Sequence, residues 1–301
     1  MRKRFLQQGC RLIATLSVVL TTLGAVSLAS AQTRETVDIA SALLEAPVPS
    51  MEAFYGEELH YSISMMGGEA ARGAITVGRP TQDEEFGRVV PVQGLVQSVG
   101  LLSAMVRFKY GGFTWMSPDS ALPIWGDKLL EDSGRSRSYE TDYTYQDYVA
   151  AITRVEGERE RSWTRFIPEQ VDDAFSWIFR LRAAPLNIGD RYTFYIFDGW
   201  LLRRLHVRVV DHVERHEDVT RRTSTMTAEL ALIADAMDDN PALPWAEKVQ
   251  GLAPVFTSRR LDDIGTMWIS LDERRLPVGM EVRTPVGFMR IAMSHHVAPT
   301  P

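Results

Sequence analysis

The feature that most constrains this chain is a succession of short segments in which polar and apolar residues alternate. Residues 58–65, ELHYSISM, show it clearly, since Leu59, Tyr61 and Ile63 alternate with polar neighbours. A period of two residues is typical of a strand that buries one face. Turn signals separate such segments about every 8–12 residues. The pattern predicts an all-β, mainly antiparallel fold, in which a curved meander forms a β-roll or a partly open barrel.

One stretch, residues 171–183, departs from this pattern and predicts one short helix packed against the sheet. Asp172 and Asp173 precede it and can accept hydrogen bonds from the N–H groups of its first turn. Pro185 and a turn at residues 187–190 end it. Its apolar stripe has the 3.6-residue period of a helix and consists of Phe175, Ile178, Phe179 and Arg182.

The same helix supplies the candidate ligand-binding residues, which are Asp173, Trp177 and Arg182. An arginine on an apolar stripe needs a partner. Asp173 and Arg182 could therefore form an ion pair that joins the helix to the sheet, or could bind an anionic ligand, and we favour the structural ion pair. If the helix were instead a lid over a ligand, Trp177 and Arg180 would face outward.

Residues 1–31 have the organisation of a secretion signal. Residues 2–4 are basic, residues 12–28 form an apolar run, and residues 29–31, Ala-Ser-Ala, form a small-x-small cleavage site. We expect export by the Sec route to the periplasm or cell envelope, with no transmembrane anchor left after cleavage. Residues 32–53 then form an N-terminal tether, and residues 54–297 form one β-roll domain.

Charge and cysteine content narrow the possible functions. The whole chain has a formal charge of −6, and the signal holds four basic residues and no acidic one. The mature chain would therefore carry a charge of −10, which argues against a nucleic-acid partner. Cys10, the one cysteine, leaves with the signal, so no thiol nucleophile, disulfide or cysteine metal ligand remains. Roughly 270 residues suffice to bury a core without disulfides.

Four motifs carry a resemblance to a known family. The first two are Gly56-Glu57-Glu58-Leu59-His60-Tyr61 with the later Gly67-Gly68, and a helix with Asp173, Ser176 and Arg182 followed by Pro185, Leu186, Gly189 and Asp190. The others are Phe197-Asp198-Gly199 and the segment WISLDERRLPV at residues 268–278. In order and spacing they resemble the exported bacterial family catalogued as domain of unknown function 3108, over roughly residues 54–297. The resemblance implies a curved, mostly antiparallel β architecture in the cell envelope, and no activity.

No compact catalytic or metal-binding signature stands out. His212 and His216 have the four-residue spacing of helix-borne metal ligands, but they lie in a segment, residues 211–218, that predicts a charged turn. There is no Gly-x-Ser-x-Gly or His-Glu-x-x-His motif. We therefore predict no catalytic residue, no metal and no cofactor.

Two classes of function remain. The sequence favours an exported envelope protein of unknown biochemical activity that is not an enzyme, either a scaffold or a binding protein. In the binding case an apolar or glycan ligand would lie in the concavity of the rolled sheet, and the partner could be a lipid, a glycan or an envelope protein. The alternative is a periplasmic hydrolase that uses carboxylate or histidine chemistry, so enzymatic activity stays an open question.

Overall fold

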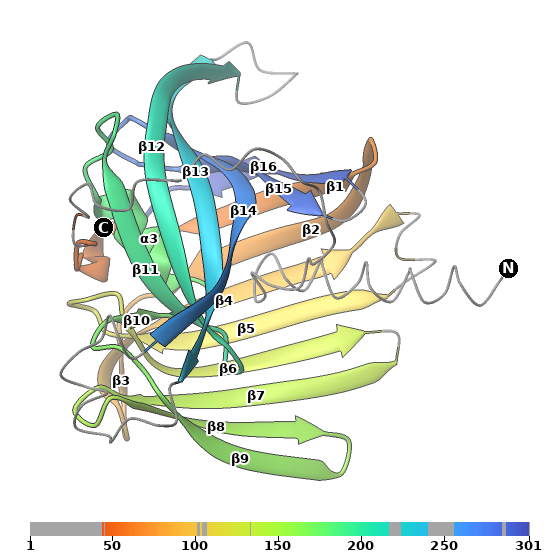
Figure 1. Cartoon of the computed structure of the whole chain (residues 1–301), viewed down its shortest axis with the longest axis vertical. Coiled ribbons are helices and arrows are strands. Elements are labelled where there is room, and N and C mark those ends of the chain that lie inside the picture. Colours follow the sequence, from red (N-terminus) through yellow and green to blue (C-terminus); the bar gives the residue numbers. More distant parts are fainter. Residues whose placement is uncertain are drawn as a thin grey trace, which may run out of the picture.

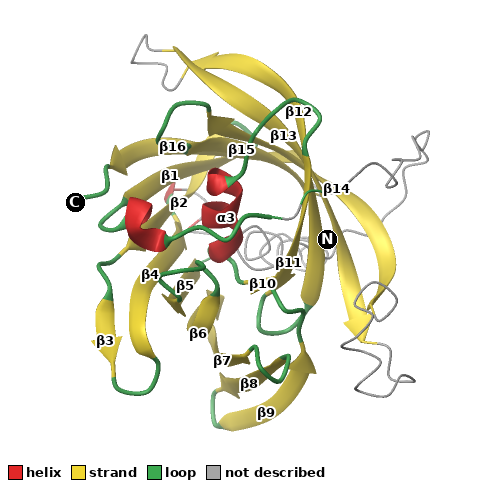
Figure 2. Ribbon diagram, turned by 90° about the vertical axis from the view of Figure 1, so that its left-hand side faces the viewer, coloured by secondary structure: helices red, strands yellow, loops and turns green. Residues whose placement is uncertain are grey.

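The computed structural model describes residues 44, 46–100, 103, 107–132, 134–216, 224–239, 256–284 and 287–300. The predicted signal, residues 1–31, and most of the predicted tether lie outside these residues. Within them, a 16-stranded sheet curves around one α-helix, α3 (Figure 1). Figure 2 shows this helix, α3, enclosed by strands from both halves of the chain. The fold is the predicted one.

The helical elements are the 3-10 helix η1 (Met51–Phe54) and α3 (Ser176–Ala183). The first nine strands are β1 (Glu58–Met65), β2 (Gly68–Val77), β3 (Thr81–Asp83), β4 (Gly87–Ser98), β5 (Phe108–Met116), β6 (Pro123–Asp132), β7 (Arg135–Thr144), β8 (Val149–Glu156) and β9 (Arg159–Phe166). The rest are β10 (Val171–Asp172), β11 (Arg191–Phe197), β12 (Leu202–His216), β13 (Ser224–Asp239), β14 (Phe256–Ser270), β15 (Pro277–Thr284) and β16 (Gly287–Val297).

Strand order explains how the sheet rolls without closing. It runs β10-β11-β12-β13-β14-β15-β16-β1-β2-β4-β5-β6-β7-β8-β9, with β3 paired to β4. The first and last strands, β1 and β16, pair with each other and join the two halves of the meander. The edges of this path are β9 and β10, which are neighbours in the chain. All pairs are antiparallel except β10 with β11, so the barrel is open between β9 and β10.

The interior beside α3 is filled by side chains. Phe175 packs its ring against the sheet where two strands carry glycine: a Cβ added to Gly94 would lie 2.3 Å from that ring, and one added to Gly112 would lie 2.9 Å from it. A Gly-Gly pair often indicates a turn, but Gly111 and Gly112 both lie within β5. The reason is tertiary, since the missing side chain at Gly112 makes room for the aromatic ring.

A second difference concerns β12. Residues 211–218 predicted a turn, but β12 runs to His216 and pairs with β13 from Leu202 to His216. Charged residues persist in this strand because it lies in a long two-stranded ladder, whose hydrogen bonds do not depend on side-chain polarity. The proline-containing segment 235–249 reads in the sequence as a polar loop, but its residues 235–239 belong to β13, and the rest lies outside the described residues. Among those residues, no helix has the length and hydropathy of a membrane span.

Candidate functional site

Asp173, the first of the three predicted site residues, lies just ahead of α3. It is buried, and its Oδ1 accepts hydrogen bonds from the backbone N–H groups of Phe175 and Ser176, both at 2.8 Å. Its own N–H donates to Ser176 Oγ at 2.9 Å, which makes the bonding of this pair reciprocal. Thr114 on β5 donates its hydroxyl to Asp173 Oδ2 at 2.5 Å. Asp173 therefore holds the turn that leads into α3 and ties it to the sheet, although the N-cap residue of the helix is Phe175, which makes no side-chain cap hydrogen bond.

Arg182, the second, forms an ion pair with Glu57. Two of its nitrogens donate to the two carboxylate oxygens of Glu57, at 2.5 and 2.8 Å. It also donates to the carbonyl oxygens of Arg274 and Arg275, at 2.9 Å each. His296 Nε2 lies 3.1 Å from the same carboxylate. The arginine therefore finds the partner it needs, but that partner precedes β1 and is not Asp173.

Trp177 and its neighbour Arg180 are both buried. The indole N–H of Trp177 donates to the carbonyl oxygen of Ala174 at 3.2 Å, and Arg180 Nη1 lies 2.6 Å from Asp172 Oδ2. Burial raises the pKa of Asp172 to about 7, although Arg180 acts in the opposite direction. The structure thus places Trp177 and Arg182 on α3 and Asp173 just ahead of it, and each of the three has separate partners inside the fold.

A second set of charged side chains lies on β7, β8 and β9 and was not among the site residues predicted from the sequence. Direct cross-strand partners point to the same side of a sheet. The register of β7, β8 and β9 therefore shows which charged side chains lie on each side of these strands. We call one side the arginine face. It carries one acid, Glu156, and six arginines: Arg135, Arg137, Arg154, Arg159, Arg161 and Arg165. The other side of these strands carries the acids Glu140, Asp142 and Glu160 and no basic residue.

The arginine face is the inward side of these strands. Tyr143, Ala150 and Ile152 share that side and are buried in a cluster with Phe197 and Leu202, from β11 and β12. The face is only partly covered, since Arg159 and Arg161 are exposed and Arg137, Arg154 and Trp163 are half-buried. It therefore lies at the opening between β9 and β10 and remains in contact with solvent.

One cross-strand row leads from the interior to this opening. The row consists of direct cross-strand partners, one on each of four neighbouring strands: Lys128 on β6, Tyr139 on β7, Arg154 on β8 and Arg161 on β9. Lys128 is only 4% exposed. Burial lowers its pKa, although Asp198 and Asp173 act in the opposite direction. Within the described part of the chain, its Nζ atom has no hydrogen-bond partner. A buried ammonium group thus stands behind exposed guanidinium groups.

The turn between β11 and β12 presses an aromatic side chain against the arginine face. Asp198 Oδ1 accepts hydrogen bonds from the N–H groups of Trp200 (2.8 Å) and Leu201 (2.7 Å). Gly199 has φ 83°, a conformation that glycine adopts at low cost. A Cβ there would lie 3.3 Å from Thr141 Oγ1 on β7. The turn therefore depends on glycine both for its shape and for its approach to the sheet.

This turn holds Trp200 beside an arginine and a second tryptophan. The rings of Trp163 and Trp200 meet edge to face, with centroids 5.4 Å apart. The guanidinium carbon of Arg154 lies 5.8 Å from the Trp200 ring and 5.6 Å from the Tyr139 ring. Trp200 nevertheless remains 47% exposed. Aromatic faces beside planar guanidinium groups can stack on flat ligand surfaces and hydrogen-bond anionic groups.

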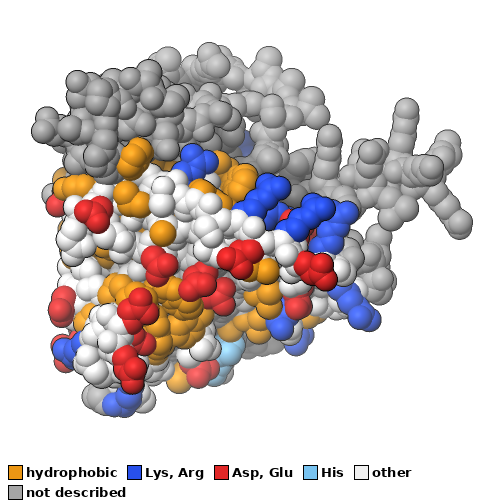
Figure 3. Space-filling view, turned by 90° about the horizontal axis from the view of Figure 1, so that it is seen from below, with side chains coloured by type: hydrophobic (Ala, Val, Ile, Leu, Met, Phe, Trp, Pro, Cys, Tyr) orange, Lys and Arg blue, Asp and Glu red, His pale blue; other side chains and the backbone are white. Residues whose placement is uncertain are grey.

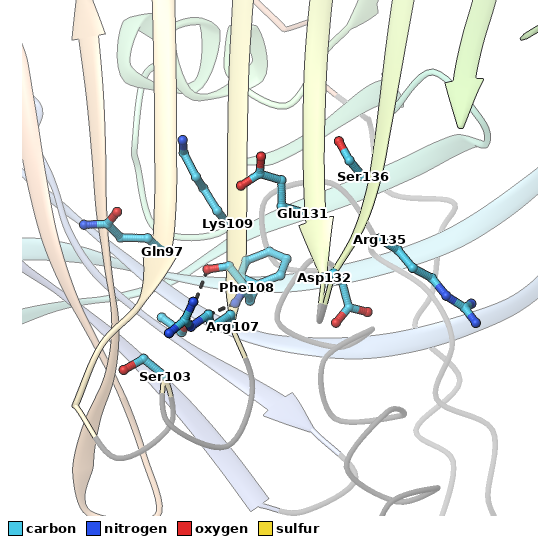
Figure 4. A pocket seen from close by; sticks show the side chains of 11 residues that line it. Gln97, Ser103, Arg107, Phe108, Lys109, Glu131, Asp132, Arg135 and Ser136 are labelled. Carbon is cyan, nitrogen blue, oxygen red and sulfur yellow. Dashed lines mark hydrogen bonds between the residues drawn. The ribbon is translucent and has the colours of Figure 1, made fainter. Parts of the chain in front are cut away.

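A pocket of about 500 Å³ lies at the ends of β4 to β7. Figure 4 shows Lys109 and Glu131 side by side on neighbouring strands, with Arg135 pointing away from them. The lining of this pocket carries both signs of charge. The basic residues are Arg107, Lys109 and Arg135, and the acidic ones are Glu131 and Asp132. The pocket therefore carries both signs of charge, whereas the arginine face is mainly basic.

His212 and His216 lie on β12. His212 Nε2 is 2.6 Å from the carbonyl oxygen of Leu186. Within the described residues, no group of three or more His, Cys, Asp or Glu side chains is arranged to hold a metal ion.

A local sequence signal for the arginine face does exist. In residues 159–165, RERSWTR, arginine and tryptophan occupy alternate positions, which places them on one side of a strand. The pattern does not reveal which side faces the interior, because that depends on how the sheet rolls.

Comparison with known proteins agrees with the motifs. The family model described as protein of unknown function, DUF3108, matches residues 60–294. Among solved structures, the chain is similar to the crystal structure of a β-barrel-like protein of domain of unknown function DUF1849 from Brucella abortus. The identity is 8%, the TM-score is 0.48, and the match covers 82% of this chain and 99% of that one. No curated protein matches. The chain belongs to the DUF3108 family of proteins of unknown function.

Proposed function

We propose that this protein is an exported, non-enzymatic binding protein of the cell envelope, and that it holds a glycan on the arginine face. The observation that carries the proposal is Trp200, which is 47% exposed although Asp198 and Gly199 fix the turn that bears it. A large aromatic side chain held half in solvent and beside Trp163 is a feature of binding surfaces. Sugar rings present flat C–H faces to such side chains and hydroxyl groups to arginine donors.

The filled interior favours a glycan over an apolar ligand. The buried core beside α3 contains Phe175, Phe179, Phe194 and Trp177. These side chains occupy the space that an apolar ligand would need in the centre of the roll. Ligand contact is therefore expected where the sheet opens, at an aromatic and polar surface.

The hydrolase alternative has less support. Acid–base hydrolysis needs two titratable groups that reach the same substrate. Asp172 has a pKa raised to about 7, but it is fully buried and bonded to Arg180 and Ser176. A carboxyl group enclosed in this way has no route to a substrate.

The envelope location rests on the sequence signal at residues 1–31. It is tested by N-terminal sequencing of the protein from a periplasmic fraction after expression of the full chain. A mature terminus at Gln32 supports export, and an uncleaved cytoplasmic product contradicts it.

Glycan binding is tested on the exported protein by isothermal titration calorimetry with soluble polysaccharides. Trp200→Ala should weaken binding at least about tenfold, the loss expected for an aromatic anchor. The matched control is Trp125→Ala, because Trp125 lies on β6 with its side chain on the outer side of the sheet. Equal losses in both variants, or no polysaccharide binding by the wild type, would refute the proposal.

A further inference from the structure

The arginine face carries more basic than acidic side chains. Its six arginines share that side of β7–β9 with one acid. Arg137 Nε lies 3.3 Å from Glu156 Oε1, and Arg154 pairs with the other oxygen of the same carboxylate. Asp132 on β6 is the direct cross-strand partner of Arg135, and Arg165 has an interaction of its own. Glu156 is shared by Arg137 and Arg154, so positive charge still predominates around Arg154 and Arg161.

This basic face belongs to a chain whose net charge is negative. The protein has a net formal charge of −6, and three of the four acids of β7–β9 lie on the opposite side of the sheet. Figure 3 shows the same unevenness on one surface of the molecule, where acidic side chains surround a hydrophobic patch and basic side chains gather at one edge. Arginines that served only solubility would be interspersed with acids.

Lys128 extends this positive surface into the interior. The carboxylates nearest to it are already used: Asp173 bonds the start of α3 and Thr114, and Asp198 bonds its own turn and lies 3.7 Å from Arg203. The Nζ of Lys128 and the hydroxyl of Tyr110 are buried without hydrogen-bond partners among the described residues. Buried polar groups of this kind are costly unless an additional partner satisfies them.

We propose that the ligand is an anionic glycan, whose carboxylate or phosphate groups pair with Arg154 and Arg161 while a sugar ring packs on Trp200. This inference rests on the proposed function and adds the charge class of the ligand. Guanidinium groups form paired hydrogen bonds with carboxylate and phosphate oxygens. The row from Arg161 to Lys128 supplies a potential that draws the anionic group inward.

The test compares three probes by isothermal titration calorimetry on the exported protein. Polygalacturonate carries carboxylates, dextran is a neutral glycan, and phosphatidylcholine vesicles containing phosphatidylglycerol present phosphate on a lipid. We expect polygalacturonate to bind at least about tenfold more tightly than dextran, as charge-assisted hydrogen bonds should provide. Its affinity should fall when NaCl is raised from about 50 to about 500 mM, because salt screens exposed charges.

Charge reversal at the exposed end of the row supplies the matched variant. Arg161→Glu should weaken polygalacturonate binding about tenfold or more, and should weaken dextran binding much less, because dextran loses one hydrogen-bond donor and no charge pair. Arg290→Glu on β16 is the control, since its exposed side chain lies on another part of the sheet, and it should bind polygalacturonate like the wild type. Circular dichroism confirms that both variants are folded.

The outcomes separate this inference from the proposed function. Equal affinity for dextran and polygalacturonate would overturn the anionic class and leave glycan binding intact. Binding to neither polysaccharide would overturn both proposals. Binding to the phosphatidylglycerol vesicles without binding to polygalacturonate would overturn the glycan in favour of a lipid phosphate.

Discussion

Arg182 on α3 forms a buried, two-pronged ion pair with Glu57, a residue 125 positions earlier that immediately precedes β1. Because β1 pairs with β16, this contact attaches the helix to the place where the two halves of the sheet join. His296 on β16 touches the same carboxylate. The pair therefore links the only α-helix of the described residues to both terminal strands.

Removing one partner of this pair should destabilise the fold strongly. Arg182→Met leaves the Glu57 carboxylate buried without its cation, and we expect a loss of about 3–5 kcal/mol in the free energy of unfolding. Urea denaturation followed by tryptophan fluorescence measures it. The double variant Glu57→Leu with Arg182→Met should recover part of the loss. Arg72→Met is the control, because the pair of Arg72 with Glu69 is exposed; a comparable loss there would contradict the argument.

The acid that pairs with Arg182 could not be predicted from the sequence. An arginine on an apolar stripe predicts a buried acid, and the sequence suggests the nearby Asp173. Asp173 instead holds the turn that leads into its own helix, which its position ahead of the helix also predicts. Local pattern thus identified the need for an acid, whereas the choice of Glu57 follows from the roll of the sheet.

The same limit applies to the rest of the fold and the candidate site. Alternation of polar and apolar residues predicted the antiparallel roll, because the apolar positions of each strand identify the side that it buries. The place of Gly112 inside a strand does not follow from the local sequence, because the aromatic ring that it accommodates, Phe175, comes from another part of the chain. The arginine face escaped notice for a similar reason, since the side on which Arg161 lies becomes the inner one only when β9 curls toward β11 and β12.

The glycine contact of Phe175 gives a second prediction. In Gly112→Ala the new methyl group would lie 2.9 Å from the Phe175 ring, so we expect a destabilisation of about 1–3 kcal/mol from overpacking. Gly111→Ala is a matched control, because its Cβ would have nothing within 4 Å and points to the other side of β5. Thermal unfolding of both variants checks this. Similar melting temperatures for the two would show that the core tolerates the methyl group.

Asp172 gives a prediction about pH. Burial raises its pKa to about 7 in the folded protein, above the value of about 4 expected in the unfolded chain. Between these values the folded state holds a proton that the unfolded state has released, so this group lowers stability as pH rises from about 4 to about 7. Urea unfolding across this range should show a flatter pH dependence for Asp172→Asn than for the wild type. Parallel curves would mean that Asp172 is already ionised when folded.

The turn that carries Trp200 gives a fourth prediction. Gly199→Ala places a side chain at φ 83° and within 3.3 Å of Thr141 Oγ1, so the variant should lose about 1 kcal/mol or more. The turn should also shift away from β7, which separates Trp200 from Trp163 and Arg154. Near-ultraviolet circular dichroism reports that change in aromatic packing. An unchanged spectrum would show that Trp200 keeps its place without the glycine. Gly157→Ala on the β8–β9 turn has a positive φ but open space around its Cβ, and it serves as the control for backbone strain alone.

Replacing Lys128 tests whether its buried ammonium group stabilises the fold or serves ligand binding. Burial lowers its pKa, so between this lowered value and the usual lysine pKa of about 10.4 the unfolded state binds more protons than the folded state. This group therefore lowers stability at neutral pH, and its cost fades as pH rises toward that value. Lys128→Met fills the same space without charge and should raise the urea midpoint at pH 7 more than at pH 10. If Lys128 also draws in an anionic ligand, the same variant should bind polygalacturonate more weakly while dextran binding stays the same. A variant that is destabilised at pH 7 would show instead that the ammonium group is well paired in the folded protein.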